Sequence, residues 1–306
     1  MIMFKILPIE KEPSFRELHT SAYPLSILEA SNTFSKKWLI QNFVNIAFKK
    51  EYDNALTYVR PYFWFWNCFK VKYSLHYPLK NVIKKVKDFL DKDYYVFLCV
   101  NEEYIPERIY YKNAYYNHEI LIFGYDDELN EFDTIAYNDK RKYDTQKVLF
   151  TDIDKAFRTD HEHLYKFYAL RINPKYNFYQ TSISSMKRGI KRYLHTKHSR
   201  KGVNAYQYLY KYVKPSLEKN EQINMRSFRM LKERAQVFAL IPEFFEINDS
   251  LNSLLKNNVH ISESLFLMVL KWNRSINPNL IESILQCINT YMENEKEFFT
   301  EFLKIL

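Results

Sequence analysis

The fold is decided by three runs within residues 94–143: YYVFLCV at 94–100, NHEILIFGYDD at 117–127 and EFDTIAYND at 131–139. The first two runs are short, rich in β-branched and aromatic residues, and bounded by turn residues, as is typical of buried strands. Gly124, Asp126 and Asp127 predict the turn between the second run and the third. An acidic pair, Glu102 and Glu103, follows the first run. We therefore expect an antiparallel hairpin folded about residues 125–130.

The hairpin brings a histidine and an asparagine together. His118 opens its first strand and Asn138 closes its second, so both are expected near the same open end. A general base needs an imidazole ring that a neighbouring amide or carboxylate holds in place. We predict His118 as the general base and Asn138 as the residue that orients it, with Asp139 as the alternative.

The pattern His-x-x-Leu-Ile-x-Gly-Tyr-Asp-Asp from His118, followed by Asn138 or Asp139, resembles the papain-like cysteine peptidases. Within them it is most similar to the C39-like branch, especially the butirosin biosynthesis protein H N-terminal family. The likeness is strongest over residues 94–157 and extends to residues 1–30. It implies an α+β papain-like fold, with a central antiparallel sheet plus an N-terminal helix, and acyl transfer from carrier proteins in natural-product and antibiotic biosynthesis. A structural hairpin whose histidine only caps a strand is the alternative.

The N-terminal helix is expected to begin near Ser21, which is a good N-cap, with Pro24 in its first turn. In papain-like enzymes the nucleophilic cysteine stands at the start of this helix, where the amides and the helix dipole lower the pKa of the thiol. The resemblance assigns that position to Ala22 and an oxyanion-donor role to the backbone amide of Tyr23. Alanine cannot be a nucleophile. Either an engineered Cys→Ala replacement or a natural loss would explain it, and the retention of both His118 and Asn138 favours the replacement.

With 306 residues, of which 47% are hydrophobic, the chain suits one domain plus a helical extension. Outside the central runs, strands are expected at 4–10 and 164–172, and helices at 33–49, 79–91 and 151–157. Beyond Pro174 the apolar spacing predicts helices at 181–194, 203–219, 224–240, 248–257, 260–273 and 278–304. We predict a papain-like (C39-like) domain over residues 1–175 and a helical domain over residues 176–306.

The composition excludes several classes of protein. Because the chain has only 3 glycines, it cannot form a Gly-rich phosphate loop or a dinucleotide fingerprint. Cys68, Cys99 and Cys287 are widely spaced and odd in number, which argues against a disulfide framework and a zinc site. No metal and no cofactor are expected. Pro8 interrupts the first apolar run too soon for a signal peptide, and no run reaches ~18 apolar residues, so we expect a cytoplasmic protein without a membrane segment.

The net charge of +9 arises mostly in the second half of the chain, where residues 181–204 are rich in Lys and Arg and contain no acid. Lys187 and Lys191, like Arg188 and Arg192, are spaced to line one helix face. The stretch is read either as a solvated face or as a dock for an acidic acyl or peptidyl carrier protein, or for the phosphate of its phosphopantetheine. Nucleic-acid binding is disfavoured because no helix-turn-helix or RNA-binding signature accompanies the charge.

These features predict an enzyme, an acyl or aminoacyl transferase that forms an amide. A thioester carried on the phosphopantetheine of a carrier protein would acylate a thiol at position 22, and a small amine would then take the acyl group. His118 would deprotonate the thiol and later the amine. The alternatives are a cysteine peptidase or amidase, in which water resolves the acyl-enzyme, and a non-catalytic binding or scaffold protein of the same fold.

Overall fold

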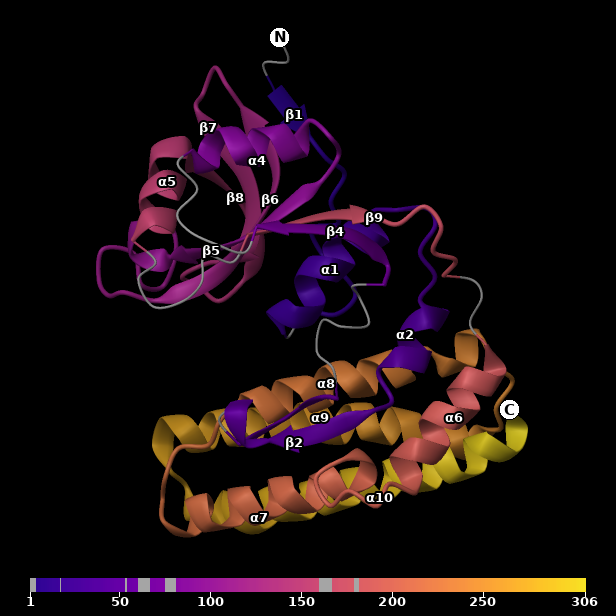
Figure 1. Ribbon diagram of the computed structural model, residues 1–306. Coiled ribbons are helices and arrows are strands. Elements are labelled where there is room, and N and C mark those ends of the chain that lie inside the picture. The colour runs from indigo at the N-terminus through magenta and orange to yellow at the C-terminus, as the bar shows by residue number, and fades with distance from the viewer. Residues whose placement is uncertain are drawn as a thin grey trace. The chain divides into compact units, whose positions relative to one another are not determined.

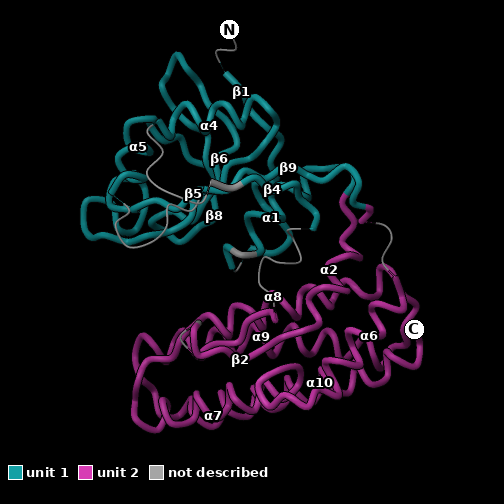
Figure 2. The backbone as a smooth tube through the Cα atoms, in the orientation of Figure 1, with its two compact units in different colours: residues 1–33, 65–176 teal, residues 34–64, 177–306 magenta. Residues whose placement is uncertain are grey.

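The computed structural model describes residues 4–16, 18–52, 54–59, 67–74, 81–159, 167–178 and 182–306. The chain divides into two compact units (Figure 1, Figure 2). Unit 1 comprises Met1–Thr33 and Phe65–Tyr176, and unit 2 comprises Phe34–Trp64 and Asn177–Leu306. The predicted boundary at residue 175 lies next to the last division. Residues 34–64, however, belong to the second unit and not to the first domain as predicted.

Unit 1 is built on one antiparallel sheet with the strand order β4–β9–β5–β6–β7–β8, and β1 pairs with β6 outside this path. The strands are β1 (Phe4–Ile6), β4 (Phe69–Ser74), β5 (Tyr95–Asn101), β6 (Asn117–Asp126), β7 (Glu131–Tyr137), β8 (Tyr143–Leu149) and β9 (Phe167–Ile172). The three predicted central runs therefore form β5, β6 and β7. Every residue of β5 is buried, which explains why its sequence is a continuous apolar run.

The strand β6 pairs with three neighbours. Its first residues pair with β5, where Ile122 lies opposite Val96, and its last residues pair with β7 and β1. The β6–β7 register shifts between Ile122 and Gly124, which marks a bulge. A Cβ at Gly124 would lie 2.8 Å from the carbonyl oxygen of Lys5, so glycine is needed for this close approach of β1. The prediction that Gly124 belongs to the turn is therefore wrong, and the turn follows Asp126.

Helices pack beside the sheet of unit 1. They are α1 (His19–Glu29), α4 (Val82–Leu90) and α5 (Phe150–Arg158), with the short 3-10 helix η2 (Glu102–Tyr104) after β5. Each of α4 and α5 buries one face, as the spacing of their apolar residues predicts. The helix α1 begins at His19, ahead of the predicted Ser21 cap, and its N-cap Leu18 offers no side-chain hydrogen bond. The helix therefore begins two residues before Ser21, and His19 is its first residue.

Unit 2 is mainly helical, so the chain is an α+β protein with an antiparallel sheet and a C-terminal helical region, as predicted. Its elements are α2 (Lys37–Asn42), β2 (Ile46–Lys49), η1 (Lys50–Tyr52), β3 (Ala55–Tyr58), α6 (Ile183–Leu194), η3 (Gly202–Asn204), α7 (Ala205–Glu218), α8 (Arg226–Phe238), η4 (Ile241–Glu243), α9 (Asp249–Ser275), η5 (Pro278–Leu280) and α10 (Ile281–Ile305). The helices predicted at 248–257 and 260–273 form the single helix α9, because no Pro or Gly separates them. The helix predicted at 33–49 is wrong at its end, where Ile46 and Phe48 pair with β3.

An ion pair is enclosed in the interior of unit 2. Arg234 on α8 and Glu295 on α10 have side chains that are 0% and 1% exposed. The Nε of Arg234 donates to the two carboxylate oxygens at 2.9 and 3.1 Å, and its Nη1 donates to the carbonyl oxygen of Phe43. The Tyr206 hydroxyl donates to Glu295 at 2.8 Å. Buried charges are tolerated when they are paired and hydrogen-bonded in this way.

Candidate active site

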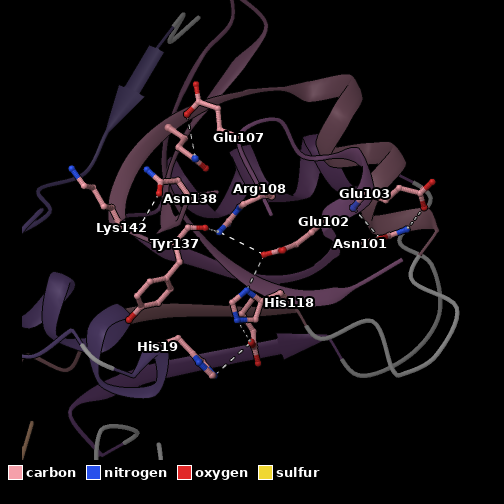
Figure 3. Close-up of polar contacts among 12 residues, drawn as sticks. His19, Asn101, Glu102, Glu103, Glu107, Arg108, His118, Tyr137, Asn138 and Lys142 are labelled. Carbon is pink, nitrogen blue, oxygen red and sulfur yellow. Dashed lines mark hydrogen bonds and ion pairs between the residues drawn. The ribbon is translucent and has the colours of Figure 1, made fainter. Parts of the chain in front are cut away.

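The candidate site of unit 1 is centred on His118, at the start of β6 (Figure 3). Its Nδ1 lies 2.9 Å from Oε1 of Glu102, on η2. The β5–β6 register sets Val100 opposite His118, so the turn that follows β5 begins beside the histidine. The side chain of Asn101 caps that turn by accepting a hydrogen bond from the backbone N–H of Glu103 at 3.1 Å. Local capping and strand pairing together therefore bring the Glu102 carboxylate to the imidazole.

Glu102 is a buried carboxylate beside a buried arginine. Its side chain is 5% exposed, and Nη1 of Arg108 lies 3.7 Å from Oε1. The same Nη1 donates a hydrogen bond to the backbone carbonyl oxygen of Tyr137 (Figure 3). The guanidinium charge offsets the cost of burying the carboxylate charge. An ionised carboxylate can only accept hydrogen bonds, so the geometry assigns the proton of a neutral His118 to Nδ1 and leaves Nε2 as an acceptor.

A second histidine lies beside this pair. His19, the first residue of α1, has its ring centroid 5.4 Å from that of His118, with 74° between the ring planes. Oε2 of Glu119 lies 3.7 Å from Nε2 of His19 and 4.0 Å from Nε2 of His118. The exposed fractions of the three side chains are 24% for His19, 20% for His118 and 16% for Glu119. The Nε2 atoms are therefore near one carboxylate at a place that solvent can reach.

Tyrosines form the surroundings of the two imidazoles. The Tyr116 ring lies 5.7 Å from that of His118, and Tyr110 stacks on Tyr116 at 4.4 Å. The hydroxyl of Tyr23 donates to the backbone carbonyl oxygen of Glu119 at 2.7 Å, which ties α1 to β6. Burial raises the pKa of Tyr23, so this hydroxyl keeps its proton and remains a donor.

The residues predicted as nucleophile position and oxyanion donor lie inside α1. Ala22 and Tyr23 are both fully buried. The Ala22 N–H donates to the carbonyl oxygen of Leu18 at 2.9 Å, and Tyr23 is one residue further into the helix, where amides are paired within the helix. From the start of α1, the ring of His19 lies 5.4 Å from the ring of His118. The sequence did not indicate this because the helix was expected to begin later.

The residues predicted to orient His118 have other partners. Oδ1 of Asn138 accepts from the backbone N–H groups of Lys140 and Lys142, both at 3.0 Å, so it stabilises the turn between β7 and β8 (Figure 3). The backbone N–H of Asp139 donates to the carbonyl oxygen of Glu107 at 2.7 Å. The hydrogen-bond partner of His118 Nδ1 is the Glu102 carboxylate, which stands where Asn138 or Asp139 was predicted.

Sequence reasoning missed three members of the site, His19, Glu102 and Glu119. A signal for Glu102 was present, since an acidic pair directly after a buried strand is expected at the same edge of the sheet as the next strand's start. Glu119 alternates with His118 along β6, and strand periodicity alone predicts opposite faces for them. The approach of His19 to Glu119 depends on where the start of α1 lies against β6, which could not be read from the sequence.

The predicted basic residues lie on α6 in unit 2. This helix buries Met186, Ile190 and Tyr193, and the charged side chains stand on its other faces. Lys187 is partly exposed, and the other three are exposed: Arg188, Lys191 and Arg192. Arg188 donates to the Ser185 hydroxyl at 3.0 Å. Among the four, Arg192 also lines a cavity of unit 2.

Comparisons with known proteins leave the chain without a family, since no family model matches it and no curated protein matches it. Among the residues that the structure describes, no group of three or more His, Cys, Asp or Glu side chains could hold a metal ion. In the same described part of the chain, no helix is both long enough and apolar enough to cross a membrane.

Proposed function

We propose that unit 1 is an acyl-transfer enzyme of papain-like architecture in which His118 is the general base. The observation that carries the proposal is the 2.9 Å hydrogen bond between His118 Nδ1 and the buried carboxylate of Glu102. A base whose ring is fixed by a carboxylate and whose second nitrogen is near solvent is the arrangement that proton-transfer catalysis requires. The rings of His19, at the start of α1, and His118, at the start of β6, lie 5.4 Å apart. This closeness of the two element starts supports the papain-like architecture.

The proposed donor is a thioester on the phosphopantetheine of an acyl or peptidyl carrier protein, and the proposed acceptor is a small amine. Because Ala22 is buried and has no nucleophilic atom, we propose direct attack by the amine in place of a cysteine acyl-enzyme. The amine nitrogen forms a bond with the thioester carbonyl carbon while Nε2 of His118 takes its proton. The C–S bond then breaks, and the imidazolium returns the proton to the leaving thiolate. The products are an amide and the free thiol of the carrier, and no metal or cofactor enters the reaction.

The proposal is tested with S-acyl-N-acetylcysteamine thioesters of increasing chain length and n-butylamine as the acceptor. Amide formation is followed by mass spectrometry and thiol release by colorimetry. His118→Ala should lower the rate about 10²- to 10⁴-fold, because removal of a general base deletes the proton acceptor.

Asp91→Asn is the control for His118→Ala, because it changes a hydrogen-bonded side chain of unit 1 away from the proposed site. Asp91 accepts a hydrogen bond from Tyr125 at 2.7 Å, and Tyr125 lies about 23 Å along β6 from His118. This variant should react like the native protein. If His118→Ala and the native protein turn over every thioester equally, the enzymatic reading fails and the non-catalytic scaffold of the same fold takes its place.

Ala22→Cys distinguishes direct attack from the covalent route. Direct attack predicts an unchanged rate that is insensitive to iodoacetamide. A large rate increase that iodoacetamide abolishes would restore position 22 as the nucleophile and the engineered Cys→Ala replacement as its explanation. Release of free acid without any amide would identify the hydrolase alternative, in which water is the attacking group.

A further inference from the structure

Unit 2 contains a cavity of about 440 Å³ that is lined by residues in and near α2, β3 and α6. Its described polar lining residues are Asn42, Asn45, Tyr58, Arg192, Thr196, His198 and Lys201. This volume falls within the range of small-molecule sites, ~300–1,000 Å³. All these residues belong to unit 2, so the described lining of the cavity comes from that unit alone.

The segment that carries the basic lining residues is fixed in place by backbone contacts. The Phe48 N–H of β2 donates to the carbonyl oxygen of Arg200 at 2.8 Å, and Ala47 forms a β-bridge with Lys201. Gly202 follows with φ +55°, and a Cβ there would collide with the carbonyl oxygen of Tyr193 at the end of α6. Glycine is therefore required for this close passage, and it holds Lys201 beside the end of α6.

The charge of the lining is one-sided. Arg192 and Lys201 are cationic and His198 can become so, while none of the described lining residues is an acid. Within the described chain, neither Arg192 nor Lys201 forms an ion pair, whereas Lys214 in the same unit lies 3.8 Å from Glu218. Arg192 and Lys201 both line the cavity, so a bound anion would supply a counter-charge to both.

We propose that this cavity binds the phosphate ester group of a small molecule. The planar guanidinium of Arg192 can donate two hydrogen bonds to a phosphate, and the ammonium of Lys201 adds a second charge. Asn42 and Asn45 supply amide donors and acceptors for the organic part of the ligand. This site is independent of His118, because it lies in unit 2 and its test does not depend on turnover.

The test is calorimetric titration of the full chain with 4′-phosphopantetheine, adenosine 5′-monophosphate, inorganic phosphate and phosphate-free pantetheine. Saturable binding of one ester at one site per chain is expected, with pantetheine at least about tenfold weaker than its phosphate. Tighter binding of 4′-phosphopantetheine would identify a carrier arm as the source of the phosphate. Tighter binding of the monophosphate would identify a nucleotide.

Two double variants distinguish binding in this cavity from non-specific attraction of the ester to the basic helix α6. Arg192→Gln with Lys201→Gln should weaken ester binding about tenfold or more, because it removes both charged donors. Arg188→Gln with Lys191→Gln removes the same charge from α6 outside the cavity and should stay within about twofold of the native affinity. Equal weakening in both pairs would overturn the proposal. So would binding of inorganic phosphate alone, or no saturable binding of either ester up to about 10 mM.

Discussion

Each unit contains a buried carboxylate held by a buried arginine, and the two differ in what completes the network. In unit 2, Glu295 is bonded by Arg234 and Tyr206, all enclosed. In unit 1, Glu102 lies beside Arg108 and accepts a hydrogen bond from Nδ1 of His118, whose side chain is 20% exposed. The enclosed network can only stabilise the fold. The open network ends on a partly exposed imidazole, which is why the proposed chemistry is placed in unit 1.

The largest effect is expected from Glu295→Ala. Removing one partner leaves the Arg234 charge buried without its carboxylate, which should lower the unfolding free energy of unit 2 by about 3–5 kcal/mol. Denaturant unfolding followed by circular dichroism measures the change. The control is Glu301→Ala, whose partner Lys304 is exposed, and this pair should contribute less than about 1 kcal/mol. A similar small loss in both variants would show that the enclosed pair is not a main stabilising element.

The next effect concerns Glu102→Gln in unit 1. The amide can keep the shape of the contact but no longer requires Nδ1 of His118 to donate, so the ring loses its fixed tautomer. Turnover should fall about 10²- to 10⁴-fold, while the unfolding free energy should change less than in Glu295→Ala. Nitrogen NMR of the imidazole reports the tautomer directly. A native spectrum with the proton on Nε2 would contradict the assigned role of Glu102.

The tyrosines around Glu295 predict an alkaline limit to the stability of unit 2. Burial raises the pKa values of Tyr193, Tyr206 and Tyr291, so these groups stay neutral in the folded chain. Their contribution to the free energy of unfolding is complete below about pH 10, the pKa of tyrosine in the unfolded chain. It is lost as the pH rises above that value. Tyrosinate absorbance should therefore increase together with the loss of helical circular dichroism. Gradual ionisation of these tyrosines before unfolding would contradict the enclosed network.

The smallest effect concerns the thiols, none of which forms a disulfide. Burial raises the pKa of Cys68 to about 12, and it also raises the pKa of Cys287, which is only partly buried. At pH 8 iodoacetamide should modify Cys287 slowly, and Cys68 and Cys99 only after unfolding. Peptide mass mapping measures the order. Cys99 lies opposite Glu119 in the β5–β6 register. Rapid modification of Cys99 in the folded protein would therefore contradict its burial and place a reactive thiol beside the candidate site.

The sequence was sufficient for features that depend on local pattern. Short runs rich in β-branched and aromatic residues and bounded by turn residues indicated β5 and β6, and the turn after the second run indicated β7. Three- and four-residue spacing indicated the helices of unit 2. His118 was found because it opens a well-marked strand. The start of α1 was misjudged because Ser21 has the chemistry of a cap, whereas the observed N-cap, Leu18, has none.

The remaining parts of the site depend on contacts between distant residues. Asn138 was a reasonable partner for His118 by hairpin geometry, but its side chain satisfies the turn between β7 and β8. Glu102 reaches His118 because β5 and β6 pair in one particular register. The spacing of apolar residues cannot specify such a register, because register depends on contacts between the two strands. It also cannot assign residues 34–64 to unit 2, because that assignment depends on packing against helices far along the chain.

The interleaving of the two units has a consequence for the synthesis of the chain. Arg234 donates to the carbonyl oxygen of Phe43, 191 residues earlier, so the segment 34–64 leaves the ribosome long before its helical partners exist. At ~5–20 residues per second, that segment waits about 10–40 s for α8 to be translated. The strands β2 and β3, with apolar residues that are buried in the finished unit, are exposed during this interval. Nascent chains stalled before residue 226 should therefore be the form of this protein that chaperones bind most strongly.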